Sequence, residues 1–345
     1  MPQGETAVPA PPYTPPAFAV ADEQGLTQLS FARRVRGRQD LGPWQQAARQ
    51  KLEELLNLPE PARLTAPEYE VLHDFAGPGY QGQKIAFACF DGQTVLAYLL
   101  LPRPLAGGLP GILALPGHGL GARSTVGLVE SRDGQMSMAA VLASQGYAVM
   151  APELRSFGER EIEGYRDPAG RKTHEVFGNF MLSLGRPLLG LTLAEAIQAL
   201  LLLAGHQAVD RRRLGVAGLS QGGRLAHLLA ALRPEARACL VASGLASSLI
   251  YDRGYSDPHD EVPGLLRYFD YPDLAGLVAP RPLLLSWGLR EWGPYWWEAR
   301  ENTTYQYLRG IYALADAPEN LDLDIHPGAH AYHPEGVLRF FAKAL

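Results

Sequence analysis

The sequence predicts an α/β protein in which a mostly parallel central sheet carries helices on both faces. From residue 111 onward, short continuous apolar runs alternate with longer segments of helical period. Such uninterrupted apolar runs are typical of strands that are buried on both faces of a parallel sheet. The composition allows this fold, because 345 residues of which 47% are apolar can bury a large core. The length suits one large domain with extensions, or two ordinary domains.

The predicted elements begin with a Pro-rich N-terminal arm over residues 1–22 and a helical extension over 23–80. In the extension, Pro43 opens a helix that runs to Leu56. Residues 81–345 form the predicted main α/β domain, which starts with a β-hairpin around the two-residue turn Asp91-Gly92. Strands are then expected at 111–115, 147–151, 213–217, 238–242, 282–286 and 321–325, and helices at 136–145, 189–203, 221–232, 296–314 and 334–345.

Two stretches of this domain show no clear period and are predicted to be lid-like insertions, at about 155–188 and 244–279. Their mixed charges, glycines and aromatic residues do not fit a buried strand or helix. Both follow predicted strands, and therefore both are placed where they could cover a binding site.

Charge and cysteine content exclude several classes of protein. A formal net charge of −5 argues against a nucleic-acid-binding surface, and the short cluster at 211–213 is interpreted as a solvated basic turn. Cys89 and Cys239 each lie in an apolar, strand-like run, which favours small buried side chains over a disulfide or a nucleophile. No group of cysteines and histidines has the spacing of a structural zinc site, so no metal is predicted.

The N-terminal residues lack a basic segment followed by an apolar segment, and thus do not resemble a secretory signal. No uninterrupted apolar stretch reaches membrane-spanning length, since the segment 194–204 is short and contains Glu195 and Gln198. We therefore expect a cytoplasmic protein that does not interact with membranes. The sequence leaves open whether the chain forms a homo-oligomer.

The segment GVAGLSQGG at residues 215–223 places Ser220 between a predicted strand and a predicted helix. This is the context of a nucleophile elbow, a sharp turn that requires small neighbours such as Gly218 and Gly222. The backbone N–H of Gln221, at the start of the helix, could stabilise an oxyanion. The alternative is that the glycines serve only to turn the chain.

A second oxyanion donor is expected from the loop after the strand 111–115. Its glycine-rich sequence makes the backbone N–H of His118 the first candidate, and that of Gly119 the next. His118 is not predicted to be the catalytic base, because in proteins with such an elbow the base follows a late strand. Its side chain is expected to line the site.

The candidate base follows the last predicted strand, in the segment 325–333, which contains three histidines. His330 is preferred because it lies within the loop, two residues after Gly328. His326 lies at the strand end and His333 at the start of the final helix, and both remain alternatives.

The candidate acid is Glu291, the carboxylate in the loop after the strand 282–286. Such an acid would hold the histidine tautomer and stabilise the imidazolium. The alternative is an exposed loop glutamate paired with Arg290. Other candidate acids are Asp322 and Asp324 on the last strand and Asp257 and Asp260 in the second insertion.

Three further residues are candidates for substrate binding. Arg155 follows another strand end and could bind a carboxylate or acyl group, or instead form an ion pair that holds the lid. Trp287 and Trp292 belong to a tryptophan cluster that could form an aromatic wall, although helix packing is the more usual explanation.

At these motifs the chain resembles the α/β-hydrolase superfamily over about residues 80–345 and, more narrowly, its dienelactone hydrolase and acetyl xylan esterase branch. The segment 218–223 is similar to the G-x-S-Q-G-G of the acetyl xylan esterases and cephalosporin deacetylases. The segments 209–215 and 279–284, and the helix-plus-hairpin arm, also resemble this branch. The resemblance implies hydrolysis of a small carboxylic ester through an acyl-enzyme, without a cofactor.

The chain departs from the deacetylases at three places. Arg155 is followed by Ser-Phe instead of Gly-Gln, Ala331 replaces the glutamate after the histidine, and Glu291 stands where these enzymes have aspartate. These departures concern the acetylated-sugar substrate and leave the triad chemistry intact. The alternatives are a serine peptidase of the same fold and a catalytically silent binding module.

Overall fold

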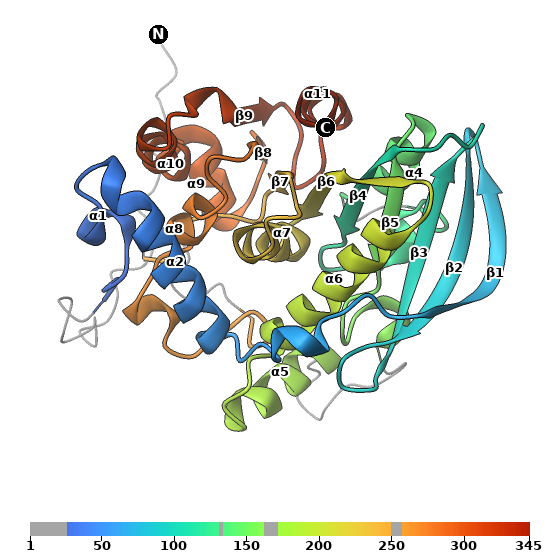
Figure 1. Ribbon diagram of the computed structural model, residues 1–345, viewed down its shortest axis with the longest axis horizontal. Helices are drawn as coiled ribbons and strands as arrows, with labels where there is room; N and C mark the ends of the chain where they lie inside the picture. Colours follow the sequence, from blue (N-terminus) through green and yellow to red (C-terminus); the bar gives the residue numbers. More distant parts are fainter. Residues whose placement is uncertain (1–25, 131–133, 162–171, 250–256) are drawn as a thin grey trace, which may run out of the picture.

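The computed structural model describes residues 26–130, 134–161, 172–249 and 257–345. A nine-stranded sheet runs through the molecule and helices cover both of its faces (Figure 1). The fold class predicted from the sequence is therefore confirmed. The predicted N-terminal arm, residues 1–22, lies outside the described residues.

The sheet is antiparallel at one edge and parallel over the rest. Its first three strands form an antiparallel meander, and the third also pairs antiparallel with the fourth strand in spatial order. All the remaining pairs of neighbours, from the fourth strand to the ninth, are parallel. The carboxyl ends of these parallel strands meet at one edge, where ligands bind in such sheets. In spatial order the strands are β1 (Tyr69–Gly77), β2 (Tyr80–Ala88), β3 (Thr94–Pro102), β5 (Ala148–Pro152), β4 (Leu109–Leu115), β6 (Val209–Leu219), β7 (Ala238–Ala242), β8 (Leu283–Gly288) and β9 (Leu321–His326).

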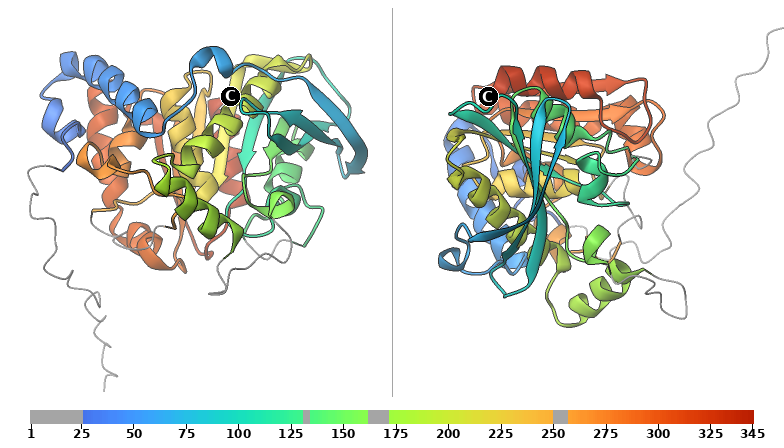
Figure 2. Two further views of the ribbon diagram at one scale, coloured as in Figure 1. Left: turned by 90° about the horizontal axis from the view of Figure 1, so that it is seen from below. Right: turned by 90° about the vertical axis from the view of Figure 1, so that its right-hand side faces the viewer.

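The helices form two layers around separate parts of the core (Figure 2). The larger layer packs on one face and the smaller one on the other. The larger layer contains α2 (Arg38–Leu55), α6 (Leu188–Gly205), α7 (Gln221–Leu232), α8 (Tyr271–Gly276), α9 (Gly293–Glu301) and α10 (Thr303–Leu314). The smaller layer contains α4 (Met138–Ser144) and α11 (Pro334–Ala344). The remaining α-helices of the described residues are α1 (Phe31–Arg34), α3 (Ala122–Thr125) and α5 (Thr173–Ser183).

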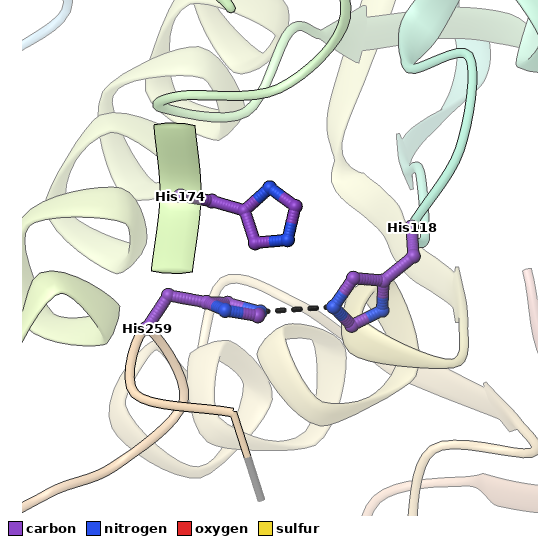
Figure 3. Close-up of side chains that lie close together, drawn as sticks. All are labelled: His118, His174 and His259. Carbon is purple, nitrogen blue, oxygen red and sulfur yellow. Dashed lines mark hydrogen bonds between the residues drawn. The ribbon is translucent and has the colours of Figure 1, made fainter. Parts of the chain in front are cut away.

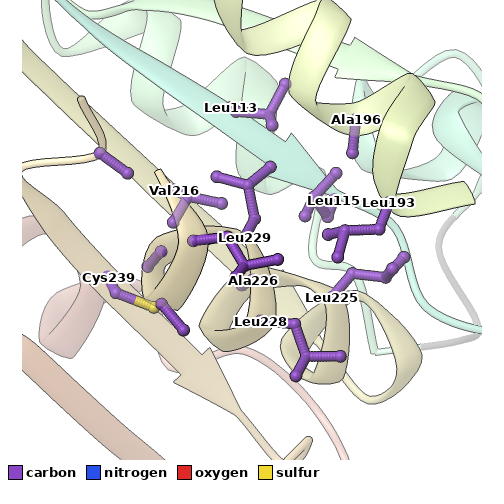
Figure 4. Close-up of a cluster of buried hydrophobic side chains, with 14 of the residues drawn as sticks. Leu113, Leu115, Leu193, Ala196, Val216, Leu225, Ala226, Leu228, Leu229 and Cys239 are labelled. Atoms are coloured by element: carbon purple, nitrogen blue, oxygen red, sulfur yellow. The ribbon is translucent and has the colours of Figure 1, made fainter. Parts of the chain in front are cut away.

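Helix α7 lies at the centre of the larger layer, and each of its residues is buried. Leu225 and Leu229 pack near Leu113 of β4 and Val216 of β6 (Figure 4). Each fully buried leucine contributes roughly 2 kcal/mol to the free energy of unfolding. This packing fixes the start of α7, and hence Ser220, relative to the sheet.

Helix α6 has 18 residues and is longer than the helix 189–203 that the sequence predicts. By length and composition alone it could cross a membrane. However, 83% of its 18-residue window is buried inside the protein. A mostly buried core helix meets the same criteria, and α6 packs in the core.

Several local predictions are wrong in detail. The hairpin turn has three residues, 90–92, because Cys89 N–H donates to Gln93 O at 2.9 Å and Gly92 adopts φ +82°. The predicted helix at 296–314 is interrupted at Asn302, which has φ +52°. The basic cluster 211–213 belongs to β6 rather than to a turn, although its side chains are exposed.

The N-terminal extension also differs from expectation. Helix α2 begins at Arg38, so Pro43 lies inside it rather than at its start. Asp40 caps the helix, because its carboxylate accepts the backbone N–H groups of Arg36 and Gly37. Strand β1 was not predicted, since its side chains are mostly exposed and give no apolar signal. The two cysteines are buried and free, as expected.

Candidate active site

Ser220 lies at the junction of β6 and α7, in a strained backbone conformation with φ 59° and ψ −121°. The chain can turn this sharply because the adjacent glycines carry no side chain. A Cβ on Gly218 would lie 1.9 Å from the carbonyl oxygen of Gly222, and one on Gly222 would lie 2.1 Å from that of Leu115. The structure therefore supports the predicted elbow, in which strain is confined to the one residue that projects from the turn.

We expect Gly218→Ala to lower the free energy of unfolding by about 3 kcal/mol, because the new Cβ would overlap backbone atoms that cannot move independently. The matched control is Gly310→Ala in α10, where no atom lies within 4 Å of the new Cβ. This control should gain up to about 1 kcal/mol from helix propensity. Urea unfolding of both variants measures the difference, and equal stabilities would contradict the steric explanation.

His330 and Glu291 form a hydrogen-bonded pair beside the carboxyl edge of the sheet. The distance between Nδ1 of His330 and Oε2 of Glu291 is 2.8 Å, and the Glu291 side chain is fully buried. Ser243 Oγ donates a hydrogen bond to the other oxygen, Oε1, of Glu291. The carboxylate is thereby held at both oxygens, which fixes the orientation of the imidazole.

Backbone contacts connect this pair to the elbow. The backbone N–H of Ser220 donates to Ala242 O at 2.8 Å, and Ala242 directly precedes Ser243. On the opposite side, a Cβ on Gly117 would lie 3.1 Å from Ser220 Cβ, and one on Gly134 would lie 2.1 Å from His330 O. Loops after several parallel strands therefore converge around Ser220.

Two aromatic rings flank His330. The ring centroid of Trp292 lies 5.3 Å from that of His330, and Tyr295 stacks against His330 at 5.7 Å. Trp292 is 53% exposed, so its ring can contact a bound molecule. Trp287, in contrast, is 1% exposed and belongs to the core, which corrects its predicted place in a substrate-binding wall.

The other histidines and carboxylates near the end of the sheet have different partners. Asp324 bonds to His333, with Oδ2 2.9 Å from Nδ1, and accepts a hydrogen bond from Ser286 Oγ. Asp322 pairs with Lys343 at 3.2 Å. The structure thus contains a second histidine–carboxylate pair, His333 and Asp324, a few residues from the first.

Two roles were predicted for Arg155, and the structure shows the second of them, an ion pair. Its guanidinium lies 2.5 Å from Glu195 Oε1 and 2.9 Å from Asp91 Oδ2, and the residue is 9% exposed. These carboxylates raise the pKa of Arg155 despite burial, which lowers it. Since Nε and Nη2 bond to these carboxylates inside the protein, Arg155 supports the loop after β5 rather than presenting a free cation to a substrate.

The predicted oxyanion donors lie on two separate elements. Gln221 is the first residue of α7, where backbone N–H groups have no partner within the helix. His118 and Gly119 lie in the loop after β4. The side chain of His118 turns to His259, with 3.0 Å between their Nε2 atoms (Figure 3). The alternative acids Asp257 and Asp260 pair with these two histidines, at 3.5 and 3.6 Å.

Sequence reasoning missed Ser243, Tyr295 and a cluster of three histidines. Ser243 directly follows β7 at the carboxyl edge and has φ 46°, a position that could have marked it. Tyr295 lies in the tryptophan-rich segment for which the sequence predicts an aromatic wall or helix packing. The histidines at 118, 174 and 259 are too far apart in the sequence for spacing to reveal them.

Comparison with known sequences places these features in context. A model described as "Abhydrolase family" matches residues 26–335 of the chain. A protein of Bacillus subtilis (strain 168) named "Putative hydrolase YtaP" is 28% identical over 202 residues, which are 56% of this chain and 64% of that protein. The alignment with this relative therefore spans somewhat less than two thirds of its length.

Solved structures share the fold at low sequence identity. A structure titled "putative acetyl xylan esterase (BF1801)" from Bacteroides fragilis NCTC 9343 has a TM-score of 0.79 at 17% identity, covering 93% of this chain and 92% of that one. A glucuronoyl esterase from Solibacter usitatus has a TM-score of 0.61 at 18% identity, covering 86% and 91%. These likenesses show an α/β-hydrolase fold.

Proposed function

Because the chain belongs to the Abhydrolase family, we propose that it is a serine hydrolase of small carboxylic esters that uses Ser220, His330 and Glu291 as a catalytic triad. The observation that carries the proposal is the 2.8 Å hydrogen bond between His330 Nδ1 and the buried carboxylate of Glu291, which Ser243 links to the strand end that binds the Ser220 backbone. The residues stand in the chain order serine, acid, histidine that such hydrolases use.

The proposed reaction begins when Ser220 Oγ attacks the ester carbonyl and its proton passes to Nε2 of His330. The imidazolium then donates this proton to the leaving alcohol, and an acyl-serine forms. In the second half, His330 takes a proton from water, hydroxide attacks the acyl carbon, and the proton returns to Ser220 as the acid leaves. The carboxylate of Glu291 stabilises the imidazolium and holds its orientation.

The developing oxyanion needs donors that are already in place. The N–H of Gln221 is proposed as one, since it lies at the N-terminus of α7, where the helix dipole favours negative charge. The N–H of His118 or Gly119 is proposed as the other, because Gly117 brings this loop against Ser220.

The proposed substrates are small or short-acyl esters, with acetylated sugars as one candidate class. Support comes from the exposed indole of Trp292 beside His330, a ring that can pack on a sugar or acyl group. The names of the fold neighbours, acetyl xylan esterase and glucuronoyl esterase, point to the same chemical class. A panel of p-nitrophenyl esters of increasing acyl length, run beside acetylated sugars, ranks these candidates.

Labelling with a fluorophosphonate probe tests the proposed nucleophile. We expect the folded protein to take up one probe, at Ser220, because only an activated serine reacts quickly with this electrophile. Peptide mass spectrometry identifies the modified residue, and Ser144→Ala, an exposed serine in α4, should label like the wild type. Labelling that persists in Ser220→Ala, or no labelling of the folded wild type, would overturn the proposal.

A further inference from the structure

We propose that His118, His174 and His259 form a binding site for a divalent transition-metal ion of the zinc class. The three residues come from the loop after β4, from α5 and from the loop before α8, so the ion would join three segments beside the candidate active site. This site is additional to the proposed hydrolysis and does not depend on it.

The geometry of the rings supports the site. One ring nitrogen of each histidine lies within 4.8 Å of one ring nitrogen of the other two, and the rings face a common centre (Figure 3). In a tetrahedral zinc site with Zn–N bonds of about 2.0–2.1 Å, the nitrogens are separated by roughly 3.3 Å. Movements of about 1.5 Å or less therefore bring all three nitrogens into one coordination sphere.

Burial and packing hold the rings in this arrangement. His174 is 6% exposed and His259 is 1% exposed. Phe157 stacks on His174, with centroids 4.4 Å apart, and Gly178 allows α5 to approach the backbone of His259, where a Cβ would lie 2.6 Å from the nitrogen. A site built on such packed elements needs little reorganisation when an ion binds.

The hydrogen bonds within the described residues do not satisfy the cluster. Nδ1 of His174, Nδ1 of His259 and Oδ1 of Asp260 are buried and lack a hydrogen-bond partner there. Leaving such groups unpaired costs about 1–3 kcal/mol each. A bound ion coordinates one nitrogen of each ring, and water bound to the ion would provide further hydrogen bonds in this buried polar region.

The charges around the cluster favour a cation on balance. Asp257 Oδ2 lies 3.5 Å from Nε2 of His118, and Asp260 Oδ2 lies 3.6 Å from Nε2 of His259. Two positive groups also act on the cluster: Arg224 on His259, with its guanidinium over the ring of Tyr271, and Lys172 on His174, with its side chain exposed to water. Three imidazoles and a carboxylate are a donor set that suits zinc.

A second cluster of possible ligands, Cys89, Asp91 and Glu195, does not carry the same inference. The guanidinium of Arg155 already pairs with both carboxylates, at 2.9 and 2.5 Å, and thereby neutralises them. Burial also raises the pKa of the Cys89 thiol to about 12, so the thiolate that a metal requires is disfavoured.

Metal binding is tested directly, without an activity assay. The full chain is treated with a chelator, dialysed and titrated with Zn²⁺ by calorimetry, and Co²⁺ is added separately to record its visible ligand-field absorption. We expect one saturable Zn²⁺ site per chain and a Co²⁺ spectrum of tetrahedral or five-coordinate type. X-ray absorption of the zinc complex should show imidazole scattering at about 2.0–2.1 Å.

The variants His174→Gln and His259→Gln should each weaken Zn²⁺ binding by about 100-fold or more, since loss of an outer-shell partner alone costs 10- to 100-fold. His333→Gln is the matched control, because it removes a ring that stacks on His326 outside the cluster. Ser220→Ala should bind Zn²⁺ like the wild type, which separates this site from the proposed nucleophile.

The proposal is overturned if the wild type shows no saturable binding, or if affinity is unchanged in both cluster variants. It is also overturned if His333→Gln loses binding to the same extent. Circular dichroism checks that the variants fold; where one does not, absence of imidazole scattering in the wild-type zinc complex overturns the proposal on its own.

Discussion

Ser220→Ala is expected to lower kcat for p-nitrophenyl acetate by about 10⁴- to 10⁶-fold, because the triad acts as a unit and loses nearly all of its effect with the nucleophile. The fold should be unaffected. Alanine has the same Cβ as serine, and the Ser220 backbone N–H can still donate to Ala242 O. A thermal unfolding midpoint within a few degrees of the wild-type value would verify this.

Two comparisons make the result specific. Ser144→Ala should keep wild-type kcat, since its hydroxyl only donates to Val141 O within an exposed helix. If Ser220→Ala hydrolysed the ester at the wild-type rate, the elbow would be a glycine turn without a catalytic role. A residual rate well above the uncatalysed one remains compatible with the proposal, because oxyanion donors act without the nucleophile.

The inner parallel strands β4, β5, β7 and β8 were predictable because they are buried on both faces and are therefore almost entirely apolar. The strand 238–242 and the helix 221–232 have the bounds that the sequence predicts. Strand β1 gave no such signal, because it lies at the sheet edge with most side chains in water. The break at Asn302 was also invisible, since the helical period continues across it and only the backbone reveals the left-handed residue.

The candidate site was predictable where chemistry follows from position along the chain. Ser220, Glu291 and His330 each follow a different strand, and loops after parallel strands meet at one edge. Contacts between distant loops gave no signal in the sequence. The hydrogen bond from Ser243 to Glu291, for example, forms because β7 and β8 are neighbours in the sheet. Whether Trp287 lines the site or packs in the core depends on which face of its strand it occupies, and the structure directs its ring into the core.

Glu291→Gln is expected to lower kcat by about 10³- to 10⁴-fold, because an amide beside Nδ1 neither stabilises the imidazolium nor holds the required tautomer. The isosteric side chain preserves the packing of the buried residue, so the loss should appear in kcat more than in KM. The stability of the variant, measured by urea unfolding, shows how far the effect is confined to catalysis.

Asp324→Asn is the control for this variant, since Asp324 bonds to His333 in the neighbouring histidine–carboxylate pair at a similar distance, 2.9 Å. If His330 and Glu291 form the triad, this variant should change kcat only a few-fold, even though a buried carboxylate is removed in both cases. The opposite ranking, with Asp324→Asn inactive and Glu291→Gln active, would assign the base to His333. The two pairs differ in their contacts: Glu291 accepts directly from Ser243, whose neighbour Ala242 accepts the Ser220 backbone N–H, whereas Asp324 accepts from Ser286, one strand further from the elbow.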